Sequence, residues 1–96
     1  MSVKKDYQHK LEVELREWDE RIKRLDAMAE EAKPEDKAEY VEHAEYLKAK
    51  QENVRKRLEK LKQAHESIWE GLKDGIDSIV DDMVNYYESV ASRFKE

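Results

Sequence analysis

Residues 11–32 read LEVELREWDERIKRLDAMAEEA, and this stretch decides the fold. Its apolar positions alternate between steps of four and three residues; they are Leu11, Leu15, Trp18, Ile22, Leu25, Ala29 and Ala32. A repeat of about 3.5 residues places these side chains on one side of an α-helix, and that side must face another helix. The stretch therefore predicts a helix over residues 5–33 that packs against a helical partner.

A second apolar repeat with the same spacing follows Pro34, the single proline of the chain. It comprises Tyr40, Ala44, Leu47, Gln51, Val54, Leu58, Leu61, His65, Ile68, Leu72, Gly75 and Ile79. Proline suits the first turn of a helix, where its missing N–H would be unpaired, and Glu35 and Asp36 favour the positive end of the helix dipole. A turn at residues 34–36 is short enough to force the second helix back antiparallel onto the first.

The length of the second helix has two interpretations. Gly71 and Gly75 are the only candidates for a terminator, and each costs about 1 kcal/mol inside a helix. The apolar repeat continues without interruption across residues 61–79, which favours one helix over residues 35–94, because a loop has no reason to preserve the phase of the repeat. We therefore expect an all-α antiparallel hairpin of a short and a long helix, within one domain of residues 1–96.

The alternative interpretation is a break near residues 67–75. Ser67 and Ser78 each precede an acidic residue by three positions, which is the pattern of a helix start. A break there would let the chain return on itself and form a three-helix bundle of roughly equal segments.

The apolar repeat changes beyond Ile79. Two successive steps of four residues, from Gly75 to Ile79 to Met83, indicate a four-residue insertion, which locally unwinds a supercoil. The apolar face also widens, and a long second helix would leave it bare, which marks an interface. We therefore expect a coiled-coil homo-oligomer, a dimer or larger bundle. Its predicted interface residues are Ile68, Leu72, Ile76, Ile79, Met83, Tyr87, Val90 and Phe94.

Composition and charge exclude several classes of protein. Charged residues make up 45% of the chain and cysteine is absent, so disulfides and thiol chemistry are excluded. Residues 66–96 contain eight acids and three bases, which accounts for the whole net charge of −5. An acidic or neutral surface argues against nucleic acid and against anionic lipid as partners.

The first residues lack the apolar core of a secretory signal, and no stretch approaches the roughly 20 apolar residues of a membrane span. We expect a cytoplasmic protein.

No arrangement of residues predicts catalysis or metal binding. The histidines are His9, His43 and His65, and no two of them have the i,i+4 spacing of a zinc-binding helix. Asp74, Asp77 and Asp81 share one helix face, but calcium sites usually draw their oxygens from a loop. We therefore expect no enzyme, no cofactor and no metal. Gln51 and His65 fall among the apolar positions, where a polar residue can fix the register of packed helices.

Several motifs together resemble one protein family. The more specific ones are Trp69-x2-Leu72-Lys73-x-Gly75 and Ala91-Ser92-Arg93-Phe94, and a Tyr-x3-Leu-x3-Leu pattern and a Lys-Pro turn precede them. Across most of its length the chain resembles small bacterial coiled-coil proteins described as stress-response or hypothetical proteins. More loosely, it is similar to the amphipathic helices of apolipoprotein-like proteins. The resemblance implies a helical cytoplasmic protein tied to stress, and it carries over no activity and no site residues.

These observations predict a non-enzymatic, self-associating coiled-coil protein whose partner is another copy of itself. It would act as a scaffold or a stress-protective interaction module. The alternative is an amphipathic, surfactant-like protein that coats lipid or polymer granules with the same C-terminal face. Interfacial helices usually carry Lys and Arg on their polar face, whereas residues 71–94 carry mostly acids, so packing of helix on helix is favoured.

Overall fold

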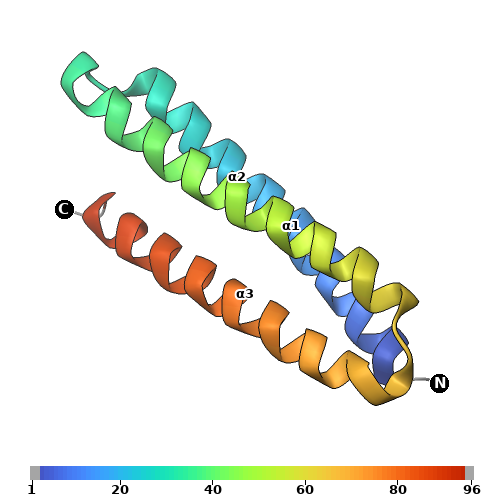
Figure 1. The fold of residues 1–96 in the computed structure, drawn as a ribbon. Helices are drawn as coiled ribbons and strands as arrows, with labels where there is room; N and C mark the ends of the chain where they lie inside the picture. The colour runs from blue at the N-terminus through green and yellow to red at the C-terminus, as the bar shows by residue number, and fades with distance from the viewer. Residues whose placement is uncertain (1–2, 95–96) are drawn as a thin grey trace. The chain divides into compact units, whose positions relative to one another are not determined.

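The computed structural model describes residues 3–94, which form three helices and contain no strand (Figure 1). They are α1 (Val3–Glu31), α2 (Pro34–Gln63) and α3 (Glu66–Phe94), of 29, 30 and 29 residues. The all-α prediction is confirmed, and the alternative of three segments of roughly equal length fits. The hairpin of a short and a long helix is corrected, because the helix predicted over residues 35–94 ends at Gln63.

The first turn lies where the sequence places it. Pro34 is the first residue of α2, and the backbone N–H groups of Asp36 and Lys37 donate to the carbonyl oxygen of Lys33 at 2.9 and 3.0 Å. Lys33 is therefore the N-cap residue, and proline occupies the position where no N–H is needed. The predicted helix over residues 5–33 ends slightly earlier, at Glu31.

The second turn consists of Ala64 and His65 and precedes the predicted break at residues 67–75. The N–H of Ala64 donates to the carbonyl oxygen of Leu61 at 3.1 Å, and the carbonyl oxygen of His65 accepts from the first turn of α3. None of the described residues has a positive φ, so this turn does not require glycine, and neither of its residues is proline. The turn therefore carries no terminator that sequence patterns could reveal, and Gly71 and Gly75 lie inside α3.

The chain divides into two compact units, Met1–Gln51 and Glu52–Glu96. The first unit contains α1 and the first part of α2, which run antiparallel (Figure 1). The Nζ of Lys48 lies 3.2 Å from the Oδ2 of Asp26 across this pair. The buried apolar side chains of this unit are those of Leu11, Leu15, Trp18, Ile22, Leu25, Ala29, Ala44 and Leu47. All of them belong to the two predicted repeats.

Gln51 is the one buried polar side chain among the described residues, and it is only 4% exposed. Its Nε2 donates to the carbonyl oxygen of Leu15 at 3.1 Å and to the Oδ1 of Asp19 at 2.7 Å. These two bonds join α2 to one position along α1, so a shift in register would leave the amide without its partners. The burial predicted for Gln51 is confirmed, and its bonding is consistent with a role in fixing the register.

The second unit contains the rest of α2 and all of α3. Its buried side chains are those of Val54, Leu58, Leu61, Trp69, Ile76, Met83 and Val90. In α3 they recur every seven residues, which is an unbroken heptad. The four-residue insertion predicted at Gly75–Met83 is therefore corrected.

The buried seam of α3, defined as Trp69, Ile76, Met83 and Val90, has a different phase from the predicted one. The repeat of α2 was expected to continue from Leu61 through His65 and Ile68. Both of these residues are exposed, Ile68 by 55%. The turn at Ala64 and His65 separates the two helices, so each takes the phase that its own packing requires.

Gly71 offers a direct test of the α3 interior. A Cβ added at Gly71 would meet no atom within 4 Å. Gly71→Ala is therefore expected to raise the free energy of unfolding by about 0.5–1 kcal/mol, because glycine is unfavourable inside a helix. This corresponds to a rise in melting temperature of roughly 4–8 °C per kcal/mol, measured by circular dichroism. At Gly75 a Cβ would lie 3.2 Å from the Nη1 of Arg57, so Gly75→Ala is expected to gain less. A loss of stability in Gly71→Ala would contradict the open space beside Gly71 in the middle of α3.

Candidate interaction surface

The predicted oligomer interface falls into three groups in the structure. Ile76, Met83 and Val90 are buried within the chain itself. Leu72, Ile79 and Tyr87 are half-buried, and Ile68 is exposed. The side chain of Phe94 lies outside the described residues. The face is therefore not bare, and the apolar surface open to a partner lies on the two sides of the buried seam.

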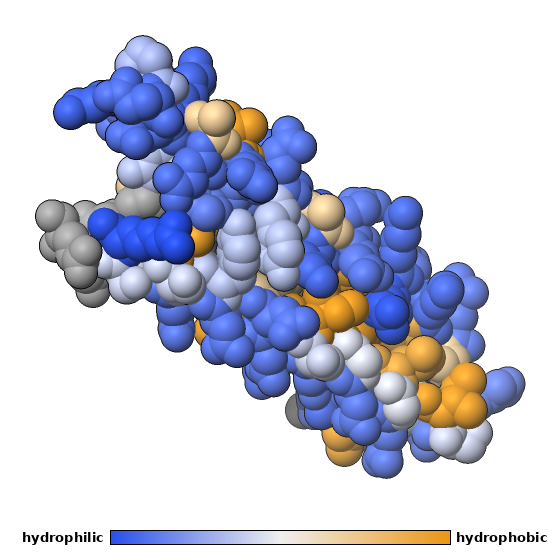
Figure 2. All heavy atoms as spheres, turned by 60° about the vertical axis from the view of Figure 1, so that its left-hand side comes forward, coloured by the Kyte–Doolittle hydropathy of each residue, from blue (hydrophilic) through white to orange (hydrophobic). Residues whose placement is uncertain are grey.

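The apolar stripe of α3 is wider than its buried seam. Its half-buried apolar residues are Leu72, Ile79, Val80, Val84, Tyr86, Tyr87 and Ala91. Leu72, Ile79 and Tyr86 follow seam residues by three positions and form one flank. Val80, Val84 and Ala91 follow seam residues by one or four positions and form the other flank. Hydrophobic side chains reach the surface among hydrophilic ones on the face drawn in Figure 2.

Three basic side chains and one acidic side chain line a hollow of about 510 Å³ in the second unit. We call this hollow the basic groove; its lining residues are Asn53, Lys56, Arg57, Glu59, Lys60 and Leu72. The Nε of Arg57 donates to the Oδ1 of Asn53 at 3.1 Å, which orients the guanidinium. Its Nη1 lies 3.2 Å from the place of a Cβ on Gly75, so the missing side chain of Gly75 makes room for the arginine against α3.

Acidic side chains form a row along α3, here called the acidic row: Glu70, Asp74, Asp77 and Asp81. The Nζ of Lys73 donates to the Oδ2 of Asp77 at 2.7 Å. The pKa of Lys73 is raised, first by this hydrogen bond and the charge of Asp77, and further by the charges of Asp74 and Glu70. No group of three or more metal-ligating side chains converges among the described residues, so the row stays a charged surface.

The histidines do not converge on these surfaces. His43 lies in the first unit, where its Nε2 is 3.4 Å from the Oε1 of Glu39 one turn earlier on α2. His9 is exposed on α1. His65, predicted to lie among the packed apolar positions, is exposed in the second turn, because the buried side chains of α2 end at Leu61 and those of α3 begin at Trp69.

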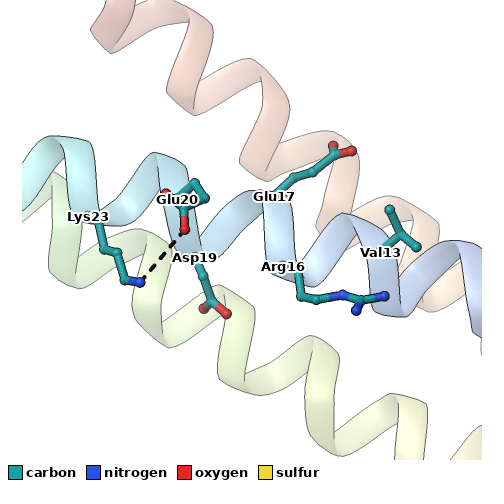
Figure 3. A pocket seen from close by; sticks show the side chains of 6 residues that line it. All are labelled: Val13, Arg16, Glu17, Asp19, Glu20 and Lys23. Atoms are coloured by element: carbon teal, nitrogen blue, oxygen red, sulfur yellow. Dashed lines mark ion pairs between the residues drawn. The ribbon is translucent and has the colours of Figure 1, made fainter.

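A second hollow, of about 390 Å³, lies along α1 (Figure 3). Its lining residues all come from this one helix: Val13, Arg16, Glu17, Asp19, Glu20 and Lys23. The Nζ of Lys23 lies 3.7 Å from the Oε1 of Glu20, and both side chains are more than 70% exposed. Exposed ion pairs of this kind contribute little to stability. The hollow is therefore part of a solvated face of α1 with mixed charge.

Sequence reasoning missed the basic groove. Its signal was present, because Lys60 lies one turn after both Lys56 and Arg57 on α2. None of the described helices is both long enough and apolar enough to cross a lipid bilayer. No family model, curated protein or solved structure matches the chain.

Proposed function

We propose that this protein is a non-enzymatic, self-associating helical module that serves in the cytoplasm as a scaffold or a stress-protective interaction protein. Its partner is a second copy of the same chain. The observation that carries the proposal is the stripe of α3, whose apolar residues on both flanks of the buried seam remain partly exposed. The stress-protective role is supported by the family resemblance of the motifs at Trp69–Gly75 and Ala91–Phe94.

Burial of these flanks provides a driving force for association. Each apolar Å² removed from water contributes about 25 cal/mol, and association must also overcome lost translational freedom and side-chain ordering. Single exposed apolar residues are ordinary on protein surfaces. A helix with two partly exposed apolar rows, such as Leu72–Ile79–Tyr86 and Val80–Val84–Ala91, presents more apolar surface than single residues do and favours a helical partner.

A coat on lipid or polymer granules would use the same apolar stripe. The polar side of α3 carries the acidic row, and interfacial helices more often carry basic residues there. Anionic headgroups would repel this row. Association between copies is therefore the function that the charge distribution favours.

Light scattering after gel filtration tests the proposal. The wild-type protein is expected to elute as particles of at least twice the chain mass of 11.5 kDa, and the fraction of larger particles should rise with protein concentration. The variant Val80→Ser/Val84→Ser removes apolar surface from one flank of α3 and is expected to shift the mass toward that of the monomer. Val13→Ser/Val41→Ser makes the same chemical change at exposed positions in the first unit and should leave the mass unchanged.

Circular dichroism accompanies these measurements, since a variant is informative only when it stays helical. A wild-type protein that remains at 11.5 kDa at every concentration would overturn the proposal. Flotation of the wild-type protein with zwitterionic or anionic vesicles would instead support the granule-coating alternative.

A further inference from the structure

We infer that two copies of the chain associate head to tail, with the acidic row of one copy docked against the basic groove of the next. This inference rests on the proposed self-association and assigns it a specific pair of surfaces. Both surfaces lie in the second unit, and their charges are opposite.

Charge is strongly segregated within this unit. The α2 segment 52–63 contains five bases and two acids, whereas α3 contains seven acids and two bases. Most of the bases therefore lie on one helix of a unit whose other helix is acidic. Opposite potentials on two surfaces steer association and fix its orientation.

The acidic row cannot reach the basic groove of its own copy. The groove contacts α3 at Leu72 and lies beside Gly75. Successive residues of an α-helix are rotated by about 100°, so Asp74 and Asp81 lie roughly 160–180° around α3 from Leu72. The two surfaces therefore point away from each other on one chain, and only a second copy can bring them together.

The docked surfaces also match in their apolar parts. Leu72 is half-buried at the wall of the groove. Val84 follows Asp77 by seven residues, so it lies almost in line with the acidic row and is also half-buried. Contact between a row and a groove would therefore cover an apolar side chain on each copy and place carboxylates beside basic side chains.

The charged groups of the contact are accessible. Four of these side chains are exposed to solvent, so an approaching copy can reach them: Lys56, Lys60, Asp74 and Asp81. Asp77 already accepts a hydrogen bond from Lys73, which leaves Asp74 and Asp81 as the main acceptors for the incoming bases. Exposed charge pairs are screened by salt, so this contact must weaken as ionic strength rises.

The contact joins two different surfaces, so it is heterologous. Heterologous contacts form rings when their rotation closes and filaments when it does not, unlike a two-fold dimer, which uses the same patch twice. The expected products are therefore assemblies larger than a dimer, with masses that grow with protein concentration.

Charge reversal tests the inference with matched variants. The groove variant is Lys56→Glu/Lys60→Glu, and the row variant is Asp74→Lys/Asp81→Lys. Each alone is expected to raise the dissociation constant at least about tenfold, because like charges then face each other. An equimolar mixture of the two is expected to regain association, since each row meets a groove of opposite charge. The control Lys10→Glu/Arg24→Glu makes the same change of charge as the groove variant, at exposed positions of α1, and should associate like the wild type.

Sedimentation velocity at low and high salt, from about 0.01 to about 1 M, provides the readout, since the Debye length falls from about 30 to about 3 Å over this range. Assembly of the wild type that is equally strong at both salt concentrations would overturn the inference. If the wild type assembles and the charge-reversed variants keep the same mass, the head-to-tail inference is overturned while the proposed self-association is retained. A wild type that is monomeric at low salt would instead overturn the proposed function.

Discussion

Trp18→Ala is expected to lower the free energy of unfolding by about 3–5 kcal/mol. Trp18 is only 2% exposed and lies in the middle of the α1 repeat. Its removal takes away the largest apolar side chain of the first unit and leaves a cavity that the surrounding side chains can fill only in part. Small domains have a total stability of about 5–15 kcal/mol, so the variant loses a large fraction of it.

Urea unfolding followed by circular dichroism at 222 nm, roughly the minimum of the helical signal, measures this loss. Trp18→Phe keeps an aromatic ring and is expected to cost much less than Trp18→Ala. Arg21→Gln removes the guanidinium, whose carbon lies 4.6 Å from the ring centroid of Trp18. Exposed cation–π contacts contribute about 0.5–1 kcal/mol, so burial must dominate. A loss below about 1 kcal/mol in Trp18→Ala would contradict the burial of Trp18.

The first hairpin could be predicted from the sequence because its signals are local and agree with one another. The repeat of residues 11–32 has one strong phase, and Pro34 with Glu35 and Asp36 specifies where the next helix begins. Each of these signals depends on residues within one or two helical turns. Propensity, capping and patterning therefore indicate the same structure.

The second turn could not be predicted because it uses residues that also favour helices. Ala64 and His65 interrupt the helix without a glycine, a proline or a positive φ. The apolar stripe of α3 is also wide enough to fit two heptad phases, one through Ile68 and the other through Trp69. Packing of whole helices decides between these phases, and a single-sequence pattern does not contain that information.

The candidate surface shows the same dependence on tertiary structure. Residues 1–65 are neutral as a whole, which conceals the concentration of bases in the segment 52–63. Gly75 was interpreted as a cost to the helix, whereas the structure places the guanidinium of Arg57 against it. The sequence showed the acidic row of α3. The basic groove is formed by residues of α2 together with Leu72 of α3, so only the structure reveals it.

The phase of α3 can be tested with two isoleucines in the same helix. Ile76 is 0% exposed, and Ile76→Ala is expected to lower the free energy of unfolding by about 2–5 kcal/mol. Ile68 is 55% exposed, so Ile68→Ala is expected to change it by no more than about 0.5 kcal/mol. The substitution is chemically identical at both positions, so each variant is the control for the other.

A helix continuous over residues 35–94 predicts a different result. Its packed repeat includes Ile68, and its expected interface includes both Ile68 and Ile76. Both variants would then lose stability, whereas the structure confines the loss to Ile76→Ala. Urea unfolding therefore distinguishes the two structures by the loss measured for Ile68→Ala. A loss above about 1 kcal/mol in Ile68→Ala would contradict the turn at Ala64 and His65, because only an uninterrupted repeat from Leu61 buries Ile68.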